Sequence, residues 1–264
     1  MPDSPILFSV FTKPWKTQPL EELCALVHDM GFDAVELTVR DGYQVQPATI
    51  AKGLPLAVKA FADNGVKITS LAVTPDERVM AAASENGIPL LRIMVKAGPE
   101  GYTASEAKAQ KEFDALVPLL DKYKVTLGIQ NHSDGYLASG AAGLRALVGK
   151  YDKKHVAAVW DCAHCALQGE NPELALDIIW PHLAMVNYKN GIWRSTTPPE
   201  AEYQKWDRYW TGGRFGLANW PKVTELLKKR NYQGVITLTA EYGDEKSVNR
   251  LIREDIHWAR SLFA

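Results

Sequence analysis

The sequence predicts one (β/α)8 barrel spanning residues 1–264. Three observations predict it: eight short apolar segments alternate with amphipathic ones, small turn signals separate them, and the length suits a barrel of this kind. A doubly wound open sheet is the alternative. A glycine-rich phosphate loop after the first strand would favour it, but the segment Phe8–Pro14 contains no glycine.

Buried parallel strands are expected at the apolar segments, because each is short and rich in Val, Ile, Leu or Thr. Their expected bounds are Ile6–Val10, Ala34–Thr38, Lys67–Ala72, Leu90–Val95, Val125–Gln130, Val156–Trp160, Leu183–Tyr188 and Val235–Ala240.

Amphipathic helices are expected between these strands and after the last one. The segment 20–30 places Leu20, Leu23 and Val27 on one helical face, and Gly31 ends it. Turn signals such as Asp63-Asn64-Gly65 stand about two residues before the next strand. The further helices are expected at about 48–63, 76–86, 104–122, 140–150, 172–179, 219–230 and 246–262.

One connection, residues 190–218 after the seventh strand, shows no clear helix or strand pattern. Long connections of this kind are usually functional or disordered, and its high aromatic content argues against disorder. We interpret it as a lid or wall over the end of the seventh strand; the alternative is a loop that packs on a neighbouring subunit of an oligomer. Its aromatic residues are Trp193, Tyr203, Trp206, Tyr209 and Trp210.

The composition limits the classes of partner. A net charge of −1, from 30 basic and 31 acidic residues, indicates neither a nucleic-acid nor a membrane partner. The N-terminal segment has no basic stretch before a long apolar run, so no export signal is expected, and no segment approaches the roughly 18 apolar residues of a membrane helix. Three cysteines are too few for a disulfide framework, so we expect a cytoplasmic protein with reduced thiols.

Polar residues stand where the last four strands end, and barrel enzymes carry their active sites at these ends. Alternation along the seventh strand places Asn187 and Lys189 on one side, and along the fifth it does the same for Gln130 and His132. The alternative is that such residues only cap the barrel or bond to loops. The polar residues at the four ends are Gln130, His132, Asp161, His164, Asn187, Lys189 and Glu241.

Four segments in this order resemble the sugar phosphate isomerase/epimerase (xylose isomerase-like) barrels, which include ketose epimerases, inosose dehydratase and hydroxypyruvate isomerase. Gly31–Leu37 resembles the strand-2 signature of that family, and Val159–His164 resembles its Asp-x-x-His motif. Gly213–Trp220 resembles the element that opens its helix 7, and Gly234–Tyr242 resembles its strand-8 element.

The resemblance implies a divalent cation held by one residue from each of strands 5 to 8, which here are Gln130, Asp161, Asn187 and Glu241. Glu and His are the family's residues at the positions of Gln130 and Asn187, so the expected site loses one negative charge and one nitrogen ligand. An all-oxygen set suits Mg²⁺ or Mn²⁺ better than zinc, and it should bind weakly. His164 is either an extra ligand or a substrate contact.

Other residues near strand ends are expected to contact substrate. The lysines at strand ends, Lys96 and Lys189, are expected to bind phosphate or carboxylate or to stabilise an enolate oxygen. The alternative is that they form a salt bridge with Glu36 or Glu241. Arginine at position 194 stands near where related epimerases place a substrate-contacting arginine. Aromatic rings that stack on a sugar are the alternative to simple core packing. The expected contacts are Glu36, Lys96, His164, Arg194, Trp15, Trp160 and Trp193, with Phe8 and Phe11 as further aromatic candidates.

The resemblance and these departures together predict a metal-assisted isomerase or lyase acting on a sugar or keto-sugar through an enediolate. Gln130 cannot take a proton at neutral pH, which argues against a two-base epimerase and favours one base. That base is Glu241, or His132 if the metal captures Glu241, and Lys189 is the third catalytic candidate.

Other classes remain as alternatives. A barrel without catalysis could bind a carbohydrate or serve as a subunit of a larger sugar-processing complex. An apurinic-site endonuclease fits poorly, because such an enzyme needs several more His and Glu metal ligands and a basic face for DNA. This chain has only six histidines and a nearly neutral charge. The Cys162-x-x-Cys165 pair is interpreted as incidental packing, since only Cys24 remains and no four-cysteine zinc site is possible.

Overall fold

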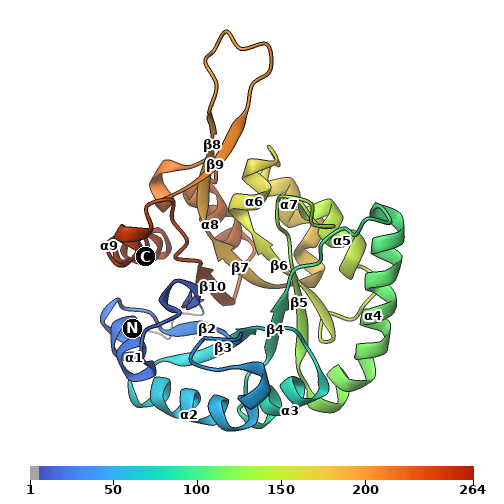
Figure 1. Ribbon diagram of the computed structural model, residues 1–264, viewed down its shortest axis with the longest axis vertical. Coiled ribbons are helices and arrows are strands. Elements are labelled where there is room, and N and C mark those ends of the chain that lie inside the picture. The colour runs from blue at the N-terminus through green and yellow to red at the C-terminus, as the bar shows by residue number, and fades with distance from the viewer. Residues whose placement is uncertain (1–5) are drawn as a thin grey trace.

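The computed structural model describes residues 6–264. Its parallel strands close into a barrel in the order β1-β10-β7-β6-β5-β4-β3-β2, and helices surround the ring of strands (Figure 1). The predicted (β/α)8 fold is confirmed. The barrel strands are β1 (Ile6–Phe11), β2 (Ala34–Thr38), β3 (Lys67–Ala72), β4 (Leu90–Ile93), β5 (Thr126–Gln130), β6 (Val156–Asp161), β7 (Leu183–Tyr188) and β10 (Gly234–Leu238).

Each predicted amphipathic segment forms a helix within a few residues of its expected bounds, and short 3-10 turns lie at several connections. The long helices are α1 (Leu20–Asp29), α2 (Ile50–Asp63), α3 (Glu77–Glu85), α4 (Tyr102–Tyr123), α5 (Ala141–Val148), α7 (Pro172–Ile179), α8 (Trp220–Lys229) and α9 (Val248–Phe263). The 3-10 turns are η1 (Lys13–Trp15), η2 (Pro47–Thr49), η3 (Trp180–His182), η4 (Gly213–Phe215) and η5 (Glu245–Ser247).

A short helix that the sequence pattern did not predict, α6 (Cys162–Leu167), follows directly from β6. Asp161 begins it, because one carboxylate oxygen of this residue accepts hydrogen bonds from the backbone N–H groups of Ala163 and His164. The helix therefore directs His164 back over the strand ends instead of letting the chain leave the barrel.

The stretch 190–218, expected to lack helix and strand, instead forms a β-hairpin, so that expectation was wrong. Strand β8 (Asn190–Ser195) pairs antiparallel with β9 (Trp206–Thr211), and the hairpin projects beyond the barrel (Figure 1). Aromatic residues are favoured in paired strands, where they contact their cross-strand neighbours. The two strands are separated by a ten-residue connection. Local turn signals do not predict a pairing across so long a connection.

The barrel interior beneath the strand ends is filled by small and flexible side chains. Met185 is the centre of this packing: its sulfur lies 3.3 Å from Thr237 Oγ1 and 3.8 Å from Ser70 Oγ, and it packs with Leu90 and Val159. These side chains fill the barrel interior beneath the carboxyl ends of the strands. No helix within residues 6–264 is long and apolar enough to cross a membrane. The expected lack of an export signal depends partly on residues 1–5, which lie outside the described part.

Candidate active site

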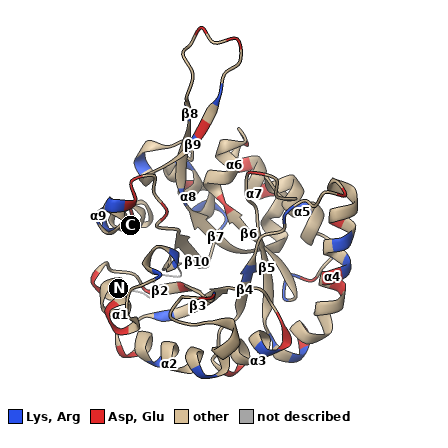
Figure 2. Cartoon of the chain, in the orientation of Figure 1, with Lys and Arg blue, Asp and Glu red and all other residues tan. Residues whose placement is uncertain are grey.

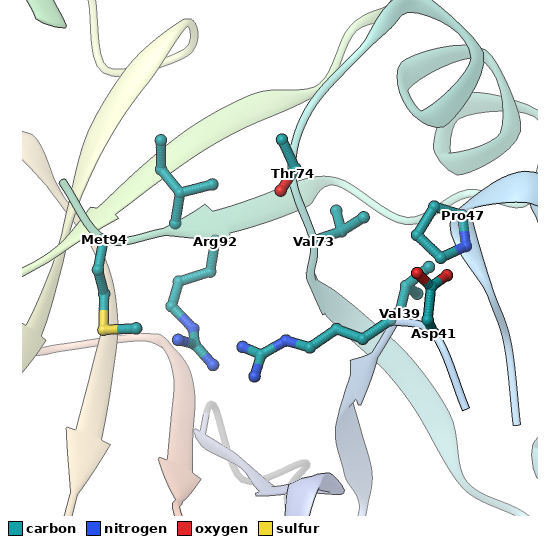
Figure 3. Close-up of a pocket in the computed structure, with 9 residues that line it drawn as sticks. Val39, Asp41, Pro47, Val73, Thr74, Arg92 and Met94 are labelled. Carbon is teal, nitrogen blue, oxygen red and sulfur yellow. The ribbon is translucent and has the colours of Figure 1, made fainter. Parts of the chain in front are cut away.

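Two adjoining cavities lie at the carboxyl ends of the barrel strands. We call them the small cavity, of about 60 Å³, and the large cavity, of about 420 Å³. Arg40, Arg92 and Met94 line both, so the two spaces are joined along this wall. Figure 3 shows the large cavity, with Arg92 and Met94 on one side and Asp41 and Pro47 on the other. The small cavity is also lined by Phe11, Lys13, Gln130, His132, His164, Asn187, Lys189, Thr239 and Glu241, and the large one by Val39, Asp41, Pro47, Val73, Thr74 and Ile93.

The carboxylate of Glu241 is paired with two lysines. Lys189 Nζ donates to Oε2 at 2.7 Å, and Lys13 Nζ forms an ion pair with Oε1. Burial alone would raise the pKa of Glu241, but the positive charges of Lys189 and Lys13 outweigh it and lower that pKa from 4.5 to about 2. Glu241 is therefore ionised at neutral pH, and each of its two oxygens is paired with a lysine.

The ammonium of Lys189 is held in place from several sides. Its side chain is only 4% exposed, and Nζ lies 3.6 Å from the centroid of the Trp210 ring in β9. The backbone carbonyl of Lys189 accepts a hydrogen bond from Trp220 Nε1 at 3.0 Å, at the start of α8. Trp210 of the hairpin therefore lies against the ammonium that follows the end of β7.

Asp161 lies behind the small cavity and is fully buried. One of its oxygens accepts the two N–H groups at the start of α6, and the other accepts Gln130 Nε2 at 3.0 Å. Burial raises the pKa of Asp161 to about 6, against the opposing charge of Lys189. Its hydrogen-bonding capacity is largely used within the protein.

Three residues that line the small cavity each have a buried polar atom with no hydrogen-bond partner among the described residues: Gln130 Oε1, Asn187 Oδ1 and His164 Nε2. Because a carboxylate can only accept, Gln130 must present its nitrogen to Asp161, which leaves its oxygen free. Buried polar atoms without partners are uncommon and carry a cost of about 1–3 kcal/mol each, so their presence together indicates a ligand site.

The rings of His132 and His164 are in contact, tilted by 34° with centroids 3.9 Å apart, and their hydrogen bonds fix opposite tautomers. His132 Nδ1 lies 2.5 Å from the carbonyl oxygen of Ser133, so Nδ1 carries the proton and Nε2 is left as an acceptor. His164 Nδ1 accepts the backbone N–H of Ser133 at 3.2 Å, so Nε2 carries the proton. Burial lowers the pKa of both rings, which keeps them neutral.

Hairpin residue Arg208 supports this arrangement. It donates to Ser133 Oγ at 2.8 Å and pairs with Asp134, while Ser133 Oγ lies 2.9 Å from His164 Nδ1. The hydroxyl can therefore accept from the guanidinium and donate to the imidazole, which reinforces the tautomer of His164.

Arg92 enters the cavities from the middle of β4. Its Nε and Nη2 donate to the two oxygens of Glu36 at 2.8 and 2.7 Å, and its guanidinium lies 4.6 Å from the centroid of the Phe11 ring. Glu36 itself is fully buried and lines neither cavity. It holds Arg92 in place from behind.

Most of the residues predicted at the ends of strands 5 to 8 meet in the small cavity, namely Gln130, His132, His164, Asn187, Lys189 and Glu241, with Asp161 directly behind them. Several residues expected to contact substrate line neither cavity. The indole nitrogens of Trp15, Trp160 and Trp193 bond to Asn249, Cys165 and Leu167, Arg194 stacks on Tyr209, and Lys96 lies over Tyr136.

Sequence reasoning missed the cations that complete the site: Lys13, Arg40, Arg92 and Arg208. One of them had a visible signal, because Arg92 interrupts the apolar strand Leu90–Ile93. Lys13 follows β1 in a short turn and Arg40 follows β2, with no local pattern to distinguish them from surface residues. Figure 2 shows basic and acidic segments within the ring of strands as well as on the outer helices.

The residues expected to bind a metal ion come together, but their charges do not fit a resident divalent cation. Both oxygens of Glu241 hold lysine ammonium groups, and Asp161 is engaged by Gln130 and by α6. Within residues 6–264, no three His, Cys, Asp or Glu side chains cluster so as to hold a metal. A divalent cation here would be placed beside the buried ammonium of Lys189 and would have to displace it from Glu241.

Solved structures with the same fold include sugar-modifying enzymes. D-psicose 3-epimerase with D-tagatose from Clostridium cellulolyticum H10 has a TM-score of 0.72 and 12% identity, over 97% of this chain and 99% of that one. The probable 3-DHS dehydratase from Bacillus anthracis has a TM-score of 0.70 and 12% identity, over 98% and 99%. A xylose isomerase-like TIM barrel protein from Mycobacterium smegmatis, in complex with magnesium, has a TM-score of 0.73 and 14% identity, over 97% and 96%.

At these identities the likeness establishes the fold alone. No curated protein sequence matches the chain significantly. The family model described as "Xylose isomerase-like TIM barrel" matches residues 24–262, which is nearly the whole chain. The chain therefore belongs to the xylose isomerase-like TIM barrel family.

Proposed function

We propose that this protein is an isomerase or lyase that acts on a sugar or keto-sugar by proton transfer through an enediolate, with a single base. The family and the epimerase and dehydratase activities named for similar structures support the reaction type. The observation that carries the proposal is the pair of opposite tautomers, His132 and His164, at one small cavity. One ring offers a lone pair there, and the other offers an N–H group.

The proposed step begins with a hydroxy-carbonyl group in the small cavity. His132 Nε2 removes a proton from the carbon next to the carbonyl, and the released electron pair forms the C=C bond of the enediolate. His164 Nε2–H donates to the carbonyl oxygen as negative charge develops there, as a neutral imidazole can. Return of the proton to the neighbouring carbon, with the hydroxyl proton passing from one enediolate oxygen to the other, completes an isomerisation. Departure of a β-hydroxyl that takes the proton from His132 and leaves as water completes an elimination.

Of the two bases considered from the sequence, His132 suits this role better than Glu241. The two lysines that engage Glu241 stabilise its ionised form, and a carboxylate with a pKa of about 2 is a weak base at neutral pH. We assign Glu241 to holding Lys189 and Lys13, whose positive charges stabilise the enediolate. Gln130 Oε1 and Asn187 Oδ1 accept hydrogen bonds from substrate hydroxyls.

Magnesium is bound by the relative from Mycobacterium smegmatis, and the reaction proposed for this chain uses no divalent cation. Positive charge at this site comes from Lys189 and Lys13, which lie on the carboxylate expected to be a metal ligand. A magnesium or manganese ion that binds at Glu241 in solution would contradict this part of the proposal.

Solvent hydrogen exchange tests the proposed function whatever product the reaction gives. The protein is incubated in D₂O with a panel of ketoses, aldoses and keto-sugars, and NMR follows loss of the proton next to each carbonyl. Exchange with at least one compound is expected, and His132→Gln should slow it about 10²- to 10⁴-fold, as loss of a general base does. His257→Gln, the same change at an exposed position on α9, is the matched control.

Undiminished exchange in the His132→Gln variant would refute His132 as the base. Sugar binding without exchange in the wild-type protein would instead support a barrel that binds carbohydrate without acting on it.

A further inference from the structure

Among the described residues, the guanidinium of Arg40 has no structural partner. It lies just after β2, is half-buried, and lines both cavities. Within residues 6–264 its side chain forms no ion pair, hydrogen bond or stacking contact, whereas its backbone bonds to Val45 and Tyr43. An arginine brought to a cavity wall without a protein partner is available to a ligand.

Arg92 shares this wall and is held rigidly. Glu36 accepts hydrogen bonds from Nε and Nη2 of Arg92, so Nη1 remains free of protein partners in the described structure. Its side chain is only 4% exposed, which lowers the local dielectric and strengthens any interaction with an anion. Arg40 and Arg92 together can therefore offer several N–H donors to one group of oxygens.

The charges that line the cavities favour an anion. Four cations, Lys13, Arg40, Arg92 and Lys189, and two carboxylates, Asp41 and Glu241, line the cavities. A third carboxylate, Glu36, is paired with Arg92 from behind and lines neither cavity. Glu241 is occupied by the two lysines, and the Asp41 carboxylate lies beside Pro47, away from the guanidinium of Arg92 (Figure 3). The part of the large cavity next to the arginines is thus the electropositive part.

We infer that the substrate carries an oxyanion, a phosphate ester or a carboxylate, which binds between Arg40 and Arg92 while its hydroxy-carbonyl group occupies the small cavity. A small cavity of about 60 Å³ holds only a few non-hydrogen atoms, and the adjoining 420 Å³ provides room for the remainder. Guanidinium groups bind the planar or tetrahedral oxygens of such anions in a bidentate manner, which neutral hydroxyls cannot match. Only the placement of the hydroxy-carbonyl group in the small cavity rests on the proposed function; the anion site between Arg40 and Arg92 does not.

Anion binding is measured by calorimetry, with inorganic phosphate and acetate titrated separately at constant ionic strength. The His132→Gln background is used, so that binding is read independently of turnover and a failure of the proposed reaction does not affect the result. Saturable binding of at least one anion is expected, and Arg40→Gln should weaken it about tenfold or more. Arg40→Lys should retain part of the affinity.

The matched control is Arg78→Gln, which removes an exposed arginine of α3 that is already paired with Asp76. It should leave the affinity unchanged. Binding of phosphate alone identifies a phosphate ester, and binding of acetate alone identifies a carboxylate. No binding of either anion, or equal binding with and without Arg40→Gln in the His132→Gln background, would overturn the inference.

Discussion

Lys189 Nζ lies 2.7 Å from Glu241 Oε2, so an ammonium lies at the carboxylate where the resemblance to metal-dependent relatives predicted a divalent cation. Lys13 occupies the other oxygen of the same carboxylate. At the same place, Gln130 and Asn187 stand where the resemblance implies Glu and His, which would mean one negative charge and one nitrogen ligand fewer. Both observations point the same way, because a carboxylate that already holds two lysines needs no further positive charge.

The first prediction concerns metal uptake. Calorimetric titration of the wild-type protein with Mn²⁺ should show no stoichiometric site, because binding at Glu241 would displace a buried ammonium. Lys189→Met should bind Mn²⁺ more tightly than wild type, since it leaves Glu241 and Asp161 with less compensating charge. Lys246→Met, at an exposed position, is the control. A stoichiometric wild-type site that is lost in Glu241→Gln would contradict this account.

The second prediction concerns the buried pair Glu36–Arg92, whose side chains are 0% and 4% exposed. Glu36→Gln leaves the arginine without its charge partner, and urea unfolding should show a loss of about 3–5 kcal/mol in the free energy of unfolding. Glu254→Gln breaks the exposed pair with Arg250 and should change it by less than about 1 kcal/mol. Similar small losses in both variants would mean that Arg92 is held by other contacts.

The third prediction concerns pH and the buried carboxyl of Asp255, which accepts Gly213 N–H at 2.8 Å and Tyr242 O–H at 2.9 Å. Burial raises its pKa from 3.8 to about 6. A raised pKa favours the protonated form in the folded state, so this contribution to stability is full below pH 4 and is lost as pH rises through 6. A shift of this size corresponds to about 3 kcal/mol.

Urea unfolding at several pH values measures this contribution. Between pH 4 and 7 the unfolding free energy of Asp255→Asn should fall less steeply than that of wild type, because the variant has no proton to lose there. Asp244→Asn, at an exposed carboxyl, should follow the wild-type curve. Parallel curves for wild type and Asp255→Asn would show that folding does not raise the pKa of this carboxyl.

Much of the site could be predicted because it follows from strand order. Once β5, β6, β7 and β10 are recognised as barrel strands, their carboxyl ends must meet, and the alternation of side chains brings Gln130 and Asn187 inward. Glu241 lies beyond the end of β10 at Leu238 and after Ala240, whose φ is positive, so its chain position places it at the mouth but alternation does not set its direction. The helix α6 could have been predicted from Asp161, an aspartate at an N-cap position. The hairpin could not be found from turn signals, since its pairing is non-local.

The sequence by itself determined the barrel, the end at which the site lies, and the polar residues that the last strands bring to it, because each of these depends on local periodicity and chain order. Only the tertiary structure decided which charges meet. It brought Lys13 and Lys189 to Glu241, put Glu36 behind Arg92, and gave His132 and His164 opposite tautomers through Ser133. Such contacts join side chains far apart in sequence, and their protonation follows from burial and partners that no local pattern encodes.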